Sequence, residues 1–295
     1  MAVAFKAPVK DIVFGYEVVE TYDVISKIPA FSDFNEDIVI PTMEECAKFA
    51  EEVLAPINAI GDQQGATIKD GKVTMPKEFI DAYKSFSEAG WASISLPSEI
   101  GGGGMPIALS GGTLEILSTA NLAFGLAPGL AAGAISAINF HGSEDQKAKF
   151  LPKLVSGEWT GTMNLSEPQS GSDLGTITTK AEPLEDGSYK ITGTKVWITF
   201  GEHDLTDNII HLVLAKIPGS PEGTKGISMF IVPKVMVNDD GSLGDDNNVS
   251  CISIEEKLGI HASPTCVMEY DGSIGYLVGE ENRGLNYMFT MMNEA

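Results

Sequence analysis

Polar and conformationally permissive residues gather in one segment, 163–175, which reads Met-Asn-Leu-Ser-Glu-Pro-Gln-Ser-Gly-Ser-Asp-Leu-Gly. Ser166 carries a short hydroxyl, and Gly171 lets the chain approach a ligand closely. Ser172 and Asp173 add polar groups beside that glycine. Exposed backbone groups and a hydroxyl can match the carbonyls and the N–H of a flat heteroaromatic ring without charge. The segment therefore indicates a binding site for such a ring, or else an elaborate strand-to-turn connection.

A second candidate segment, 193–199, reads Gly-Thr-Lys-Val-Trp-Ile-Thr and is typical of a strand. Trp197 and Thr199 are two residues apart, so a regular strand places them on the same face. A flat indole beside a hydroxyl suits a flat heteroaromatic ring, although Trp197 could also be an ordinary core residue.

The remaining candidates for catalysis are weaker. The four histidines, at 141, 203, 211 and 261, show no spacing typical of metal ligands. His211 lies in an apolar run and is expected to be structural, whereas His261 lies in a connecting loop and is the one most expected to face a ligand. No serine or cysteine has a recognisable base beside it, which argues against a hydrolase.

Four consecutive glycines at 101–104 raise the question of a phosphate-binding turn. The dinucleotide fingerprint would need a third glycine at position 106, which is Pro106. We therefore expect a flexible turn between helices, bordering a substrate channel. A nicotinamide dehydrogenase that uses this glycine run stays open as a third interpretation.

Composition narrows the class of protein. A chain of 295 residues is long enough for two domains with a hydrophobic core. The net charge of −22 would repel nucleic acid and anionic lipid surfaces, so we expect neither nucleic acid nor a membrane as partner. Three cysteines without a CxxC pair argue against a disulfide framework or a zinc site. No signal peptide is recognisable, and no apolar run approaches the ~20 residues of a membrane span, so we expect a cytoplasmic protein.

The chain divides by pattern into an irregular leader (1–30), a helical domain (31–158), a β domain (159–278) and the start of a new helix (279–295). In the helical part, capping boxes are expected at Thr42 and Ser143, and Pro56 is expected to close the first helix. A helix should follow Pro76, and 122–138 should form a buried pair of helices. In the β domain, Asp-Gly turns at 186–187, 240–241 and 271–272 should separate the strands.

Several segments, in order, resemble the acyl-CoA dehydrogenase family over nearly the whole chain. The matching motifs are Leu-Ser-Glu-Pro with Gly-Ser-Asp in 165–173, Lys-Val-Trp-Ile-Thr in 195–199, 257–265 and 279–285. Asn164 and Thr176 depart from the residue types usual at the ends of the first motif. The leader 5–8 and the phrase Gly-Glu-His-Asp at 201–204 are similar to the subgroup that includes methylthiopropanoyl-CoA dehydrogenases.

The resemblance implies an α+β fold with a helical N-terminal domain, a middle β-barrel domain and a C-terminal helical bundle, here truncated to its first residues. It implies FAD as cofactor, an acyl-CoA substrate, electron-transfer flavoprotein as electron acceptor and a homo-oligomer for the complete protein. The residues that it places at the flavin ring are Met163 and Leu165 through their backbone, Ser166 through its hydroxyl, Trp197 by packing and Thr199 near N5. It places Ser172 near the pantetheine arm of CoA.

The family reaction removes the α-proton of the acyl-CoA with a glutamate while hydride leaves the β-carbon for the flavin. The resemblance puts one family position for that glutamate at Ala295 and the other far downstream. Glu294 is not nominated, because a shift of one residue turns a helical side chain by about 100°. We therefore expect the catalytic glutamate beyond Ala295 and little activity of this chain alone. The alternative is a non-catalytic fragment that binds acyl-CoA or a partner.

Overall fold

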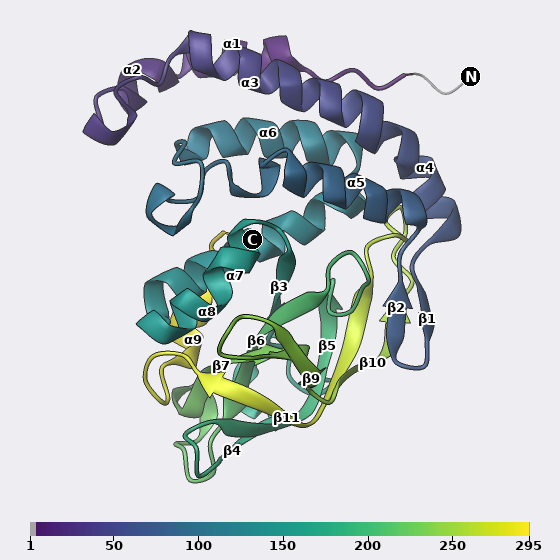
Figure 1. Ribbon diagram of the computed structural model, residues 1–295, viewed down its shortest axis with the longest axis vertical. Coiled ribbons are helices and arrows are strands. Elements are labelled where there is room, and N and C mark those ends of the chain that lie inside the picture. Colours follow the sequence, from purple (N-terminus) through teal and green to yellow (C-terminus); the bar gives the residue numbers. More distant parts are fainter. Residues whose placement is uncertain (1–3, 295) are drawn as a thin grey trace.

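The structure is a computed structural model that describes residues 4–294, with helices in its first half and strands in most of its second half (Figure 1). The helices are α1 (Val9–Val18), α2 (Thr21–Ile25), α3 (Glu36–Phe49), α4 (Ala55–Gln64), α5 (Lys77–Glu88), α6 (Ile107–Ala120), α7 (Leu122–His141), α8 (Glu144–Val155) and α9 (Gly284–Met292). The strands are β1 (Thr67–Lys69), β2 (Lys72–Thr74), β3 (Trp159–Asn164), β4 (Lys180–Pro183), β5 (Tyr189–Thr199), β6 (Asn208–Lys216), β7 (Ile227–Pro233), β8 (Val235–Val237), β9 (Leu243–Asp246), β10 (Val249–Glu255) and β11 (Thr265–Leu277). The expected order of a helical part followed by a sheet is confirmed.

Aromatic packing holds the helical part together. Helix α5 buries Phe79, Tyr83 and Phe86, which recur at helical spacing, as its sequence predicts. All three rings pack against Phe124 of α7, with centroids 5.6–6.3 Å apart. Such pairs contribute about 0.5–1.5 kcal/mol each beyond the area that they bury.

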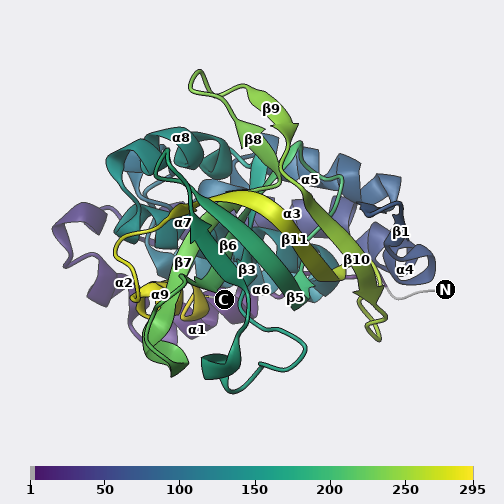
Figure 2. The same ribbon diagram turned by 90° about the horizontal axis from the view of Figure 1, so that it is seen from below.

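The main sheet has seven strands, and β11 is its longest. Strand β11 pairs antiparallel with β10 on one side and β5 on the other, and the three lie side by side in Figure 2. Strand β7 pairs with both β6 and β11. The prediction of a strand-separating turn at 271–272 was wrong, because Gly272 (φ 73°) forms a bulge inside β11. A β1–β2 hairpin within the helical part was not expected from the sequence.

Helix α7 packs on the sheet (Figure 1). The contact is close: a Cβ added at Gly161 of β3 would lie 2.3 Å from the Cβ of Ala134 in α7. The expected pair of helices in 122–138 is instead this one helix of 20 residues, which continues through Pro128. By length and mean hydropathy (1.5) α7 could cross a bilayer, contrary to the expectation that no segment would qualify. More than half of it is buried within the protein, which is typical of a core helix.

Three expectations for the N-terminal part were wrong. The leader is not irregular, since α1 and α2 occupy much of it and Ile12 is buried against the helical core. Helix α3 begins at Glu36, so Thr42 lies inside it and its hydroxyl donates to the carbonyl of Ile38. Pro56 does not end a helix but stands in the first turn of α4. A π-helical turn over Ala50–Leu54 joins α3 to α4 and keeps this stretch helical.

Other local predictions are confirmed. Ser143 forms a full capping box with Gln146 at the start of α8. A helix follows Pro76, and α9 begins at Gly284. The glycine run 101–104 is a packed turn and not a phosphate loop, because its N–H groups donate to carbonyls of 93–98. The expectation of a flexible turn is thus replaced by a close fit, in which a Cβ at Gly102 would lie 2.2 Å from the carbonyl oxygen of Leu96.

This fit predicts that Gly102→Ala destabilises the chain by about 1–3 kcal/mol, as overpacking does when backbone must move. Gly111→Ala is the matched control, because Gly111 lies in α6 with nothing within 4 Å of the added methyl. It should stabilise the helix by roughly 0.5–1 kcal/mol. Urea unfolding measures the change in the free energy of unfolding for each variant. Equal changes for the two substitutions would contradict the close packing of the turn at Gly102.

Candidate functional site

A β-bulge near the end of β5 shapes the candidate site. Ile198 pairs with Cys266 and Lys195 with Met268, so Val196 and Trp197 together face a single residue of β11. In a regular strand, Lys195, Trp197 and Thr199 would share one face. The bulge instead turns Lys195 into the interior, where it is buried, and leaves Trp197 57% exposed.

Trp197 is unusual in both its exposure and its backbone. Its φ is 60°, in the left-handed region that a bulky side chain rarely adopts. Such a conformation costs of order 1–3 kcal/mol and persists only where the surroundings impose it. The large apolar ring is nonetheless presented to the surface, which excludes the interpretation of Trp197 as a core residue. A strained, exposed aromatic residue is typical of a binding site.

The two segments singled out from the sequence lie together. The N–H of Val196 donates to the carbonyl of Ser166 at 2.9 Å, which joins β5 to the loop after β3. Across that loop, a Cβ added at Gly171 would lie 3.7 Å from the Trp197 ring. Leu165 and Ser166 are half-buried, while Gly171 is exposed. The indole therefore lies over a surface lined by backbone of the predicted segment.

Glu167 folds this loop by accepting hydrogen bonds from several directions. Its carboxylate accepts from the N–H and hydroxyl groups of Thr178 and Thr179 at 2.5–3.1 Å. It also accepts from the Gln169 amide at 2.8 Å and from Lys195 Nζ at 2.9 Å. In addition, the backbones of Glu167 and Ser170 exchange two hydrogen bonds, which close the turn before Gly171.

Lys195 and Glu167 form a buried ion pair, with side chains 0% and 2% exposed. The Lys195 ammonium also donates to the carbonyl of Leu165 at 2.9 Å. Burial alone would raise the pKa of Glu167, but the Lys195 charge and the threonine donors outweigh it and lower that pKa to about 2. Burial lowers the pKa of Lys195 to about 8 against the opposing effect of Glu167. Both groups are therefore mainly charged at neutral pH.

The other expected site residues lie on β3, on β5 and in the loop after β3, the segments that this pair joins. Met163 is half-buried in β3 opposite Leu212 of β6, and Thr199 is half-buried at the end of β5 opposite Thr265. Ser172 is exposed in the loop next to Gly171. Neither Glu167 nor Lys195 is among the residues expected from the sequence to form the site. A charged residue within the alternating pattern of β5 was the available signal, but only the bulge shows that it turns inward.

Two of the histidines are interior residues. The hydroxyl of Thr162 lies 2.7 Å from His211 Nδ1, and His203 Nε2 lies 2.9 Å from Thr160. Burial lowers the pKa of both rings to about 3, so both are neutral and the structural role expected for His211 is supported. His261 lies in the loop before β11, with its Nδ1 3.0 Å from the carboxylate of Asp62. No group of residues within 4–294 has the arrangement of a metal site.

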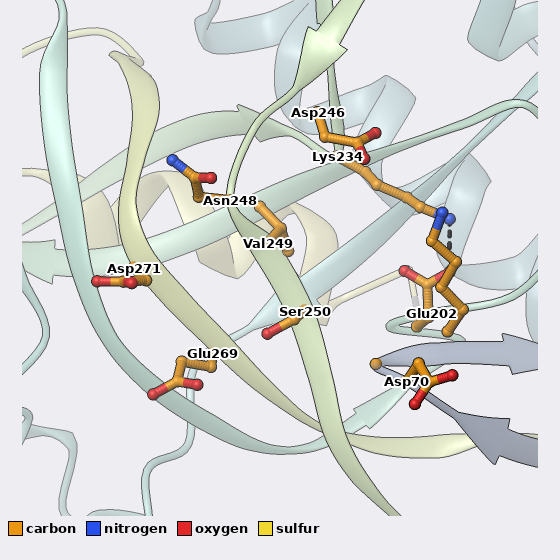
Figure 3. A pocket seen from close by; sticks show the side chains of 11 residues that line it. Asp70, Glu202, Lys234, Asp246, Asn248, Val249, Ser250, Glu269 and Asp271 are labelled. Carbon is orange, nitrogen blue, oxygen red and sulfur yellow. Dashed lines mark hydrogen bonds and ion pairs between the residues drawn. The ribbon is translucent and has the colours of Figure 1, made fainter.

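A group of carboxylates lines a separate cavity of about 370 Å³ (Figure 3). Asp70, Asp246, Glu269 and Asp271 line it together with a Glu202–Lys234 ion pair. Burial raises the pKa of Glu202, and Lys234 opposes that effect. Beyond the neutralised pair, four acids and a single further cation, Lys72, line the cavity, and this excess of negative charge would repel the phosphates of a nucleotide or of CoA. This cavity contains none of the expected site residues.

The surface beside Trp197 suits a flat polar ring. Trp197 offers an apolar face, and Gly171 leaves room beside it. The N–H of Ser166 donates to no acceptor within residues 4–294, although the adjoining N–H of Glu167 is bonded to Ser170. An unbonded donor beside an exposed indole fits the carbonyl-bearing end of a flavin.

Comparison with known proteins identifies the family. Residues 42–158 match the acyl-CoA dehydrogenase N-terminal domain and residues 162–273 match the acyl-CoA dehydrogenase middle domain. The chain therefore belongs to the acyl-CoA dehydrogenase family, of which it carries these two domains. Residues outside the two matched ranges include α1 and α2.

Individual relatives are similar over nearly all of this chain. The 3-methylmercaptopropionyl-CoA dehydrogenase of Ruegeria pomeroyi is 47% identical over 99% of this chain and 50% of its own length. A butyryl-CoA dehydrogenase of Syntrophomonas wolfei is 40% identical over 92% of this chain and 45% of its own. The chain spans about half the length of these curated relatives. An acyl-CoA dehydrogenase from Bacillus anthracis, complexed with FAD, matches with a TM-score of 0.71 and 27% identity over 89% of this chain and 40% of its own.

The ion pair predicts a defined loss of stability in acid. A folded pKa of about 2 for Glu167, against 4.5 when unfolded, stabilises the fold by about 3 kcal/mol above pH 4.5. Below that pH the unfolded chain binds the extra proton, so the stabilisation is lost as pH falls from 4.5 to 2. Urea unfolding of the wild type and of Glu167→Gln between pH 7 and pH 3 measures this, because the variant lacks the titrating group. If the free energy of unfolding fell with pH equally in the wild type and in Glu167→Gln, the lowered pKa of Glu167 would be contradicted.

At pH 7, Glu167→Gln should cost about 3–5 kcal/mol, since it leaves the Lys195 ammonium buried without its counter-charge. Asp81→Asn is the matched control, because it removes one carboxylate from the exposed Lys77–Asp81 pair on α5. Its effect on the free energy of unfolding should be small. If the two substitutions lowered the free energy of unfolding by similar amounts, burial would not be what makes the Glu167–Lys195 pair strong.

Proposed function

We propose that the chain forms the flavin- and acyl-CoA-binding part of an FAD-dependent acyl-CoA dehydrogenase, which oxidises the α,β-bond of an acyl-CoA thioester. The observation that carries the proposal is the strained and exposed Trp197, held beside the unbonded Ser166 N–H. Family membership and the FAD-bound relative support FAD as the cofactor. The pairing of β7 with both β6 and β11 supports closure of the sheet into the expected barrel.

In this proposal, FAD supplies a two-electron acceptor for the hydride that leaves the substrate β-carbon. Trp197 covers the ring and keeps water from it, and the backbone at Met163 and Leu165 with the Ser166 hydroxyl holds its polar edge. Thr199 hydrogen-bonds near the reacting edge, and Ser172 contacts the pantetheine arm. The site would hold the flavin ring and the thioester in a fixed relative orientation. This orientation accounts for much of the expected rate of hydride transfer, because it removes the entropic cost of aligning the two reactants.

Proton removal from the α-carbon needs a base. The resemblance places it at the position of Ala295, whose side chain has no carboxylate, or much farther along the family sequence, so no described residue receives this role. Glu294 follows the last turn of α9 and is exposed. The proposal has three further parts. The cytoplasmic location rests on composition, whereas electron-transfer flavoprotein as the electron acceptor and a homo-oligomeric complete enzyme rest on the family resemblance.

The test of function is the visible spectrum of the purified chain with FAD, before and after anaerobic addition of acyl-CoAs. The panel includes 3-methylmercaptopropionyl-CoA and butyryl-CoA, because relatives carry those names. Bound flavin that bleaches would establish dehydrogenation by this chain itself. Bound flavin that does not bleach would support an intact ring site without its base, or a non-catalytic acyl-CoA-binding fragment. A chain that binds no FAD would contradict the ring site.

Binding at Trp197 has its own prediction. FAD should quench the emission of the exposed Trp197, and Trp197→Phe should remove most of that quenching. The affinity for FAD should fall roughly threefold to tenfold, as expected for a weaker aromatic contact. Trp91→Phe, in the helical part, is the control and should leave the quenching intact. Unchanged quenching in Trp197→Phe would place the flavin elsewhere.

A further inference from the structure

The peptide group between Leu165 and Ser166 has an unusual electrostatic environment. Its carbonyl accepts a hydrogen bond from the Lys195 ammonium at 2.9 Å. No cis peptide occurs within residues 4–294, and in a planar trans peptide the C=O and N–H point in opposite directions. The Ser166 N–H therefore points away from Lys195, toward the side where it meets no protein acceptor within the described chain.

The charge behind this peptide is buried. The Lys195 side chain is 0% exposed, so water does not screen its action on the carbonyl. A hydrogen bond from a charged donor polarises the peptide and makes its N–H a stronger donor. The opposing charge of Glu167 is shared among the Thr178 and Thr179 donors as well as Lys195. That sharing leaves the ammonium directed at the peptide.

The same pair also holds the peptide in place. Val196, next to Lys195, donates to the carbonyl of Ser166, and Glu167 follows directly in the chain. Three successive residues of the loop are thus each bonded to their surroundings, at the Leu165 carbonyl, the Ser166 carbonyl and the Glu167 side chain. The Ser166 N–H, on the peptide bonded to Lys195, meets no acceptor within residues 4–294. Its direction is fixed by bonds on both sides.

We propose that Lys195 is a positioning residue that polarises the Leu165–Ser166 peptide, so that the Ser166 N–H donates a strengthened hydrogen bond to a pyrimidine carbonyl of the flavin. This inference rests on the proposed function and assigns a further residue to it. Negative charge increases on that end of the ring when it takes up two electrons and a proton. A stronger donor there stabilises the reduced ring more than the oxidised ring.

The variant that tests this role replaces the ion pair with neutral groups of similar shape, Glu167→Gln with Lys195→Met. Removing both charges avoids an unpaired buried charge, and such replacements often leave a fold stable. Lys195→Arg restores the charge. Lys216→Met is the matched control, because Lys216 Nζ also donates to a backbone carbonyl, that of Gly175, in a different part of the loop.

The first measurement needs no cofactor. Hydrogen exchange of the Ser166 amide, followed by NMR in the free chain, reports its acidity, because a nearby positive charge speeds base-catalysed exchange. The neutral double variant should exchange Ser166 about threefold to tenfold more slowly, whereas Lys195→Arg and Lys216→Met should match the wild type. A merely structural role of the pair predicts the opposite sign, since a loosened loop exchanges faster. Equal or faster exchange in the double variant would therefore overturn the proposal.

The second measurement compares the affinities for oxidised and reduced FAD, with dithionite as the reductant. The double variant should lose roughly fivefold to tenfold more affinity for reduced than for oxidised FAD, and Lys195→Arg should restore the wild-type ratio. An unchanged ratio in a folded variant would overturn the role of Lys195 while leaving the proposed function intact. A wild-type chain that binds no FAD would instead contradict the proposed function, and the amide exchange would then decide alone whether Lys195 polarises the peptide.

Discussion

The buried ion pair between Glu167 and Lys195 is the interaction on which the candidate site depends. Desolvating two charges is expensive, and here the cost is offset by six hydrogen bonds to the carboxylate and a second partner, the Leu165 carbonyl, for the ammonium. The pair joins the loop after β3 to the bulged end of β5. Because neither charge can remain buried alone, the loop and the strand are constrained to one relative position.

That constraint explains why strain can be tolerated at Trp197. The bulge places two residues of β5 opposite one of β11, and the ion pair fixes the residue on one side of it. The left-handed backbone of Trp197 is a consequence of this register, and the surrounding hydrogen bonds offset its strain. Helix α7 packs against β3 through the close contact at Gly161. The exposed indole is therefore carried by a rigid support and not by a mobile loop.

The charge of the chain is consistent with a site built from backbone. The chain has 19 lysine and arginine residues against 41 acidic residues, so few cations are available to bind an anionic ligand. Lys195 is not one of them, because it is buried and paired with Glu167. Backbone N–H groups can bind a polar ring without a positively charged side chain at the surface. A buried ammonium behind the peptide strengthens such a donor while the surface itself stays neutral. The acidic cavity lined by Asp246 and Glu269 lies apart from this surface.

The sequence by itself determined the order of a helical part and a sheet, the strand that ends at Thr199, the helix beginning at Gly284 and the residues 163–175 and 193–199 that lie together. These features follow from local periodicity, turn chemistry and family motifs, all of which depend on residues close together in the sequence. It did not determine the start of α3, the continuity of α7 through Pro128 or the bulge within β11, because tertiary packing overrode the local signals. Only the tertiary structure decided that Lys195 turns inward to Glu167 while Trp197 turns outward. A one-residue bulge reverses the faces of a strand, and its position depends on the partner strand.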